Sequence, residues 1–140
     1  MSTITEIENT LLAVIADLDR WAMIQSAGRK VLPDPVYYPA CFVIWDGDED
    51  TGSTPRPIDH VDFKVIIQTQ NLGSEDMAAL DAYALNDLVR LQIRGKVLGI
   101  PDIEPFVCVS RKCTDYDDSE GMIEYTHIYR TRQYQPMVTE

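Results

Sequence analysis

The sequence predicts an α+β fold in two layers: a mostly antiparallel sheet with two amphipathic helices on one face. The first observation is a period of two from Val61 to Thr69, where apolar side chains alternate with mainly polar ones, as in a strand with one buried face. The second is a helical period that begins after Ser74, a favourable N-cap, and ends at Gly95, a favourable C′ residue. The third is the grouping of strands into runs broken by this helix, which is typical of helices laid over one face of a sheet.

The first element is a helix that begins at Thr3, where Glu6 three residues later indicates a capping box. We expect Asp19 and Arg20 to end this helix, and residues 21–27 to form a short strand. The apolar stripe of the helix consists of Ile4, Ile7, Leu11, Val14, Ile15 and Leu18.

Residues 28–39 are expected to form a loop, because three prolines exclude a central strand. Ala40–Asp46 is the next strand, and its apolar residues on both faces predict that both faces are covered. Residues 47–57 consist almost wholly of Asp, Glu, Gly, Ser, Thr and Pro, so we expect a mobile acidic loop before the strand that begins at Ile58.

The second helix is expected to bury a stripe made of Met77, Leu80, Ala84, Leu88 and Leu91. Residues 96–104 then cross the sheet, residues 106–109 form the fourth strand, residues 114–121 form an acidic hairpin loop, and Met122–Tyr134 is a long last strand. The predicted order is α-β-β-β-α-β-β in one domain that spans all 140 residues, with a frayed tail over 135–140.

Composition excludes several classes of function. The 140 residues can bury roughly two-thirds of their unfolded surface in a single core. A net charge of −11, from 23 acidic and 12 basic residues, disfavours nonspecific binding to nucleic acid. The apolar runs are too short to cross a bilayer and the acidic N-terminus lacks the features of a secretory signal. We therefore expect no membrane association and a chain that stays in the cytoplasm where it is made.

Residues 46–50 resemble the start of a calcium-binding EF-hand loop, because oxygen ligands stand at alternate positions. Thr51 occupies the position that requires glycine, and Pro57 occupies the position that requires a bidentate glutamate. A solvated acidic turn is the better interpretation of this segment.

The three cysteines have no metal-binding spacing with the two histidines. Cys41 and Cys108 lie in apolar strands and are expected to be small buried hydrophobic residues. A reactive pair of Cys108 and His127 on neighbouring strands is geometrically conceivable, but a hydrogen-bonded, half-buried histidine is the simpler interpretation. We therefore expect no metal, no cofactor and no enzymatic activity.

Several segments share their order and hydrophobic pattern with one known group of proteins. They are the helix segment Ile7–Ala16, the strand start Tyr38–Val43, a loop rich in Gly, Asp and Pro, the strand His60–Ile67, the helix segment Leu85–Val89 and the final hairpin Arg111–Tyr134. In these segments, which cover nearly the whole chain, the sequence resembles tail-completion proteins of contractile- and long-tailed bacteriophages, in particular the Mu-like Gp37 family and the tail terminators. The family has no catalytic residue to carry over.

The resemblance implies a virion protein, assembled in the host cytoplasm, that forms a homo-oligomeric ring, usually a hexamer. Such a ring caps the tail tube, stops its polymerisation and presents a surface to a head-completion or connector protein. A closing interface needs exposed strand edges and loops, and we expect the long last strand and the 47–57 loop to supply them. DNA would pass through the lumen without specific binding, because acidic side chains there would repel it.

Charged side chains are the candidate contacts with a neighbouring subunit or with the tail-tube protein. They are Asp46, Asp48, Glu49, Asp50, Arg56, Arg111, Lys112, Arg130 and Arg132. The alternative function is a small cytoplasmic ligand-binding or adaptor domain of the same fold class, which would stay monomeric or dimeric and contain a concave apolar pocket.

Overall fold

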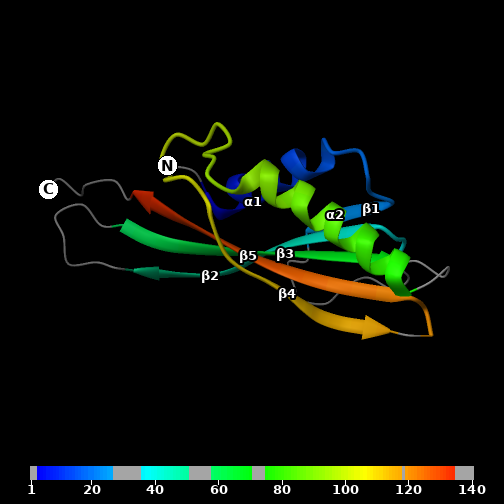
Figure 1. Ribbon diagram of the computed structural model, residues 1–140. Helices are drawn as coiled ribbons and strands as arrows, with labels where there is room; N and C mark the ends of the chain where they lie inside the picture. Colours follow the sequence, from blue (N-terminus) through cyan, green and yellow to red (C-terminus); the bar gives the residue numbers. More distant parts are fainter. Residues whose placement is uncertain (1–2, 27–35, 51–57, 71–74, 118, 135–140) are drawn as a thin grey trace, which may run out of the picture.

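The computed structural model describes residues 3–26, 36–50, 58–70, 75–117 and 119–134. Figure 1 shows two helices on the same side of one twisted sheet. The elements are α1 (Ile4–Ala16), β1 (Met23–Ser26), β2 (Ala40–Asp50), β3 (Ile58–Gln70), α2 (Glu75–Ile93), β4 (Val107–Asp117) and β5 (Met122–Tyr134). The predicted α+β class and the predicted element order are both confirmed. The predicted frayed tail and most of the predicted 28–39 loop lie outside the described residues.

The sheet has the strand order β1-β2-β3-β5-β4. β1 pairs with β2 in parallel, and the other neighbours are antiparallel. β5 pairs with β3 along its full length, from Ile58 opposite Tyr134 to Gln70 opposite Met122. The expectation that the last strand supplies an exposed edge is therefore wrong: β5 lies between β3 and β4, because it returns from β4 through a short turn and pairs with β3 on its other side. The edges of the sheet are β1 and β4.

α1 begins and ends through local hydrogen bonds. The Thr3 hydroxyl accepts a bond of 3.1 Å from the backbone N–H of Glu6, which confirms the predicted N-cap. The helix ends at Ala16, slightly before the expected stop, and Asp19 turns the chain with a φ of 51°. The indole N–H of Trp21 donates to the carbonyl of Ile15 at 2.8 Å, so one of the last helical carbonyls is satisfied.

α2 buries a different face from the predicted stripe. Ala84 and Leu91 are exposed and Leu88 is only half-buried, whereas the side chains of Met77 and Leu80 lie outside the described residues. The residues that face the core are Ala82, Leu85, Asn86, Val89 and Ile93. α2 carries apolar residues on several sides, so a rotation of about 100°, one residue step, exchanges one apolar stripe for another.

β2 and β4 extend further than the sequence predicted. Gly47 to Asp50 continue β2, so the expected 47–57 loop is wrong for these residues, and 51–57 lie outside the described residues. β4 likewise continues to Asp117, through the first half of the expected 114–121 loop. Their partners β3 and β5 are long enough to pair with these acidic residues, and register shifts at Trp45/Gly47 and Cys113/Asp115 accommodate the extra residues.

The main core lies between the helices and the sheet. Ile7, Leu11 and Ile15 of α1 pack there with the inward residues of α2 and with the alternating residues Val61, Phe63, Val65 and Ile67 of β3. On the opposite face, Ala40, Phe42 and Ile44 form a second buried cluster with Met23, Val36 and Ile66. β2 is therefore buried on both faces near its start, as predicted. None of the described helices is long and apolar enough to span a membrane.

Candidate functional site

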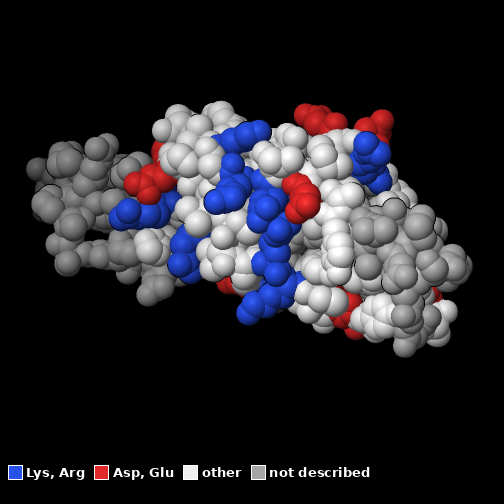
Figure 2. Space-filling view, in the orientation of Figure 1, with Lys and Arg blue, Asp and Glu red and all other residues white. Residues whose placement is uncertain are grey.

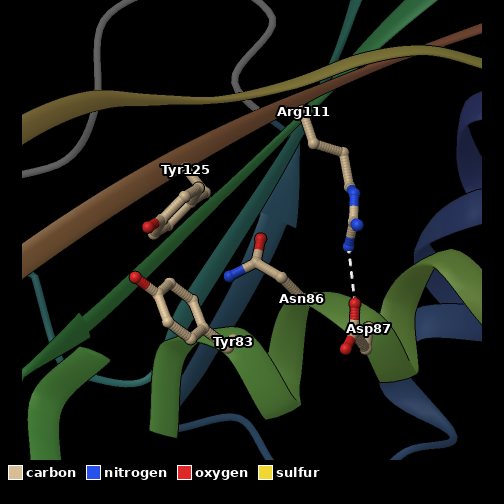
Figure 3. A pocket seen from close by; sticks show the side chains of 5 residues that line it. All are labelled: Tyr83, Asn86, Asp87, Arg111 and Tyr125. Carbon is tan, nitrogen blue, oxygen red and sulfur yellow. Dashed lines mark hydrogen bonds and ion pairs between the residues drawn. The ribbon is translucent and has the colours of Figure 1, made fainter. Parts of the chain in front are cut away.

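An open hollow of about 330 Å³ lies between α2 and the strands β4 and β5. Its lining residues come from two elements that converge: Tyr83, Asn86 and Asp87 from α2, and Arg111 and Tyr125 from the sheet. In Figure 3 the guanidinium of Arg111 reaches down to Asp87, with a distance of 2.8 Å between Nη1 and Oδ1. The rings of Tyr83 and Tyr125 meet edge to face, with their centroids 6.3 Å apart.

His127 lies fully buried beneath this hollow and is held on both ring nitrogens. Its Nε2 is 2.6 Å from Asn86 Oδ1, and its Nδ1 is 2.7 Å from the hydroxyl of Tyr129. The Asn86 amide donates its own N–H to the carbonyl of Ala82, so Oδ1 must accept and Nε2 must carry the proton. Nδ1 then accepts from Tyr129. This network joins α2 to β5 through three buried polar side chains.

Burial dominates the titration of the network. It lowers the pKa of His127 to about 3, and the positive charges of Arg111 and Arg90 act in the same direction. Burial also raises the pKa of the Tyr129 phenol above its usual range. His127 is therefore neutral at physiological pH and is more deeply buried than the sequence predicted.

Two of the cysteine thiols, those of Cys41 and Cys108, have pKa values raised by burial. Register places Cys108 opposite Tyr129 and Arg111 opposite His127, so Cys108 and His127 do not form a cross-strand pair. The Cys108 thiol donates to the carbonyl of Ser110 at 3.7 Å, and partial burial raises its pKa. Cys41 is fully buried, as predicted, and burial raises the pKa of its thiol further.

Three arginines gather at the same side of the molecule and form the arginine cluster: Arg90, Arg94 and Arg111. All three act electrostatically on the Cys108 thiol, and the end of α2 lies beside the start of β4, where the N–H of Gly95 donates to the carbonyl of Phe106 at 2.8 Å. Arg90 and Arg94 also line a second hollow with Leu91 and Gly95 at the end of α2. Figure 2 shows basic side chains in a band across the middle of the view, where α2 and β4 lie in Figure 1.

The structure divides the predicted contact residues between the two faces of the sheet. Arg111 lies on the helix side, within the arginine cluster, and its neighbour Lys112 is exposed on β4. Asp46, Arg130 and Arg132 instead lie in ion pairs: Asp46 with Lys64 at 3.4 Å, Arg130 with Asp62 at 2.8 Å and Arg132 with Glu104 at 3.5 Å.

The remaining predicted contact residues have no described side chains. Asp48, Glu49 and Asp50 have a described backbone that pairs with β3, and Arg56 lies outside the described residues. Arg90 and Arg94 are not among the contact residues predicted from sequence, although their spacing of four residues places them on one helix face.

No group of three or more His, Cys, Asp or Glu side chains in the described part of the chain is arranged to hold a metal ion. The acidic start of the 46–50 segment is part of β2, in which Asp46 pairs with Lys64.

Comparisons with known proteins found a structure of similar fold but no similar sequence. No protein-family model matches the chain, and a search of curated proteins found no similar sequence. Among solved structures, a chain from the virion of a native gene transfer agent (GTA) particle has a similar fold. The TM-score is 0.57 at 18% sequence identity, and the similarity covers 88% of this chain and 86% of that chain.

Proposed function

We propose that this chain is a structural protein of a phage-like particle. The observation that carries the proposal is the fold shared with a chain of the gene transfer agent virion, which extends over 88% of this chain and 86% of the other. The similarity therefore involves the whole domain and not a single supersecondary motif. The sequence resemblance to phage tail-completion proteins supports the same role independently.

In finer terms, the chain is a tail-completion protein that acts as a tail terminator. Copies of it form a ring on the end of the tail tube. The resemblance to tail terminators implies six subunits in this ring. The ring stops tube polymerisation, contacts the tail-tube protein on one side and receives the head-completion or connector protein on the other. DNA passes through the lumen without specific binding. The protein is assembled in the host cytoplasm and resides in the virion.

The chemistry of the described residues is compatible with a role that requires no catalysis. Both ring nitrogens of His127 are engaged in buried hydrogen bonds, and the thiols of Cys41 and Cys108 have raised pKa values. Both described helices lie on one face of the sheet, and on the other face charged side chains meet in exposed or half-exposed ion pairs. Such a surface can contact the other proteins of the particle through side chains.

The test is deletion of the gene from the genome that produces the particle, followed by electron microscopy of the lysate. A terminator that is missing should leave tubes longer than normal, with few of them joined to heads. Expression of the wild-type chain from a second locus should restore both the tube length and the joining. Tubes of normal length that carry heads in the deletion strain would contradict the proposal.

A ligand-binding adaptor is the second candidate, and the hollow lined by Tyr83, Asn86 and Arg111 is the observation that favours it. The hollow is open, and its Arg111 already pairs with Asp87. An adaptor should retain a small molecule through purification, at one molecule for each chain by native mass spectrometry, and should lose it on Arg111→Ala.

A further inference from the structure

Parts of the two opposite edges of the sheet carry opposite charge. At the β4 edge, the arginine cluster combines three guanidinium groups, and Asp87 is the one carboxylate paired with them in the described part of the chain. Lys112 adds a further exposed cation on β4 itself. This part of the edge, beside the end of α2, is positive in a chain whose net charge is −11, whereas Asp115 and Asp117 lie further along β4. Because most other exposed charges are negative, the cluster is a localised feature and not an average property of the surface.

An exposed apolar side chain lies within the cluster. Leu91 is 66% exposed and lines the hollow at the end of α2 with Arg90 and Arg94. Arginine mixed with large apolar side chains is the composition of protein–protein interfaces. A surface that bound only phosphate would gain nothing from this apolar group.

The opposite edge of the molecule is acidic. α1 packs over β1 and β2, whereas α2 packs over β3 and β5, so the two helices lie toward opposite edges of the sheet. α1 and the turn after it carry Glu6, Glu8, Asp17 and Asp19 against the single cation Arg20. Of these, Glu6, Asp17 and Asp19 are exposed, and no ion pair involves them within the described residues.

From this polarity we infer that the arginine cluster and Leu91 form a docking surface for the acidic α1 edge of a second copy of this chain. The contact is head-to-tail, because two different surfaces meet, and a head-to-tail contact that is repeated with a closing rotation produces a ring. The inference rests on the proposed ring and names the two surfaces that join its subunits. Charge complementarity fixes which edge meets which and speeds their encounter.

The test uses full-length chains with reversed charge. One variant carries Arg90→Glu and Arg94→Glu, and a second carries Glu6→Lys and Asp17→Lys. Their self-association is measured by sedimentation up to millimolar concentration, in about 50 mM and about 500 mM NaCl. The wild type should associate more weakly at the higher salt concentration. Each variant alone should lose about tenfold or more in association constant, since attraction at the contact becomes repulsion.

Mixing the two variants should restore association, because the acidic α1 edge of the first then meets the intact arginines of the second, and the reversed edges attract each other. A matched control carries Lys64→Glu and Arg132→Glu on the other face of the sheet, changes net charge equally and should associate like the wild type. Circular dichroism checks that every variant is folded.

Three results would overturn the inference. The first is wild-type chain that does not associate under any of these conditions, and the second is association that survives the reversal or is not restored by mixing. The third is that the wild type binds a short DNA duplex, measured by fluorescence anisotropy, and that Arg90→Glu/Arg94→Glu abolishes this binding. That result would make the arginine cluster a nucleic-acid site. None of these results depends on tube length in the deletion strain, so the proposed function can stand or fall separately.

Discussion

Acidification should destabilise this protein through His127. The free histidine has a pKa near 6.5, and burial lowers that of His127 to about 3 in the folded chain. Between these two values the unfolded chain binds a proton that the folded chain does not, so the free energy of unfolding falls as the pH falls. The slope approaches about 1.4 kcal/mol for each pH unit, which amounts to about 2 kcal/mol between pH 7 and pH 5.

The control is His127→Gln, because glutamine keeps one donor and one acceptor for Asn86 and Tyr129 but does not titrate. Urea unfolding of both proteins should be followed at several pH values between 7 and 5. The carboxylates titrate in both proteins, so the difference between the two curves isolates His127. We expect the wild type to lose about 2 kcal/mol more than the variant over this range. Parallel curves would refute the assignment of a buried, neutral His127.

Three further predictions concern the packing, the cap and the thiols. In urea titrations, Ile93→Ala should lower the free energy of unfolding by about 2–5 kcal/mol, because Ile93 is buried. Leu91→Ala, on the exposed side of the same helix, should change it by less than about 0.5 kcal/mol. Equal losses would contradict the assignment of the Ile93 face of α2 to the core. Thr3→Ala should cost about 1 kcal/mol in the same assay, since the N–H of Glu6 loses its acceptor, and a neutral effect would argue against the cap. In the native protein a colorimetric disulfide reagent should react quickly with Cys113, which is exposed, and with Cys41 only after unfolding; rapid native reaction at Cys41 would contradict its burial.

The parts of the fold that sequence predicted well are those in which pattern and packing agree. The alternation from Val61 to Thr69 lies on a central strand with one face toward the helices, so period and burial coincide. Met122–Tyr134 was predicted with the bounds that the structure shows. For both strands the prediction uses only local information, because the alternation of neighbouring residues indicates which face of the strand is buried.

The errors arose where tertiary pairing outweighed local preference. Asp, Glu and Gly predict a turn, yet Gly47 to Asp50 form a strand, because β3 offers unpaired backbone groups opposite them. The face of α2 was misassigned for a different reason. Asn86 belongs to the buried face because it binds His127, and a hydrophobic period cannot register a polar residue whose partner lies 41 positions away in sequence.

The candidate site depended on the same long-range contacts. The sequence identifies Arg111 as a charged candidate contact residue, but its association with Arg90 and Arg94 follows from the packing of the end of α2 beside the start of β4. The rotation of α2 decides which of its residues face solvent. Because the hydrophobic pattern of α2 predicts the wrong buried face, the sequence alone does not bring these arginines together with Arg111.

The two irregularities in β4 have a consequence for crowding. Register shifts leave Val109 and Thr114 without a directly opposite residue in the backbone ladder with β5, so the outer rim of the sheet bends at two points. A regular strand from another molecule could not form a continuous ladder of backbone hydrogen bonds along β4. At the other edge, β1 is only four residues long. Copies of the chain at high local concentration can therefore come into contact without pairing their edge strands into fibrils.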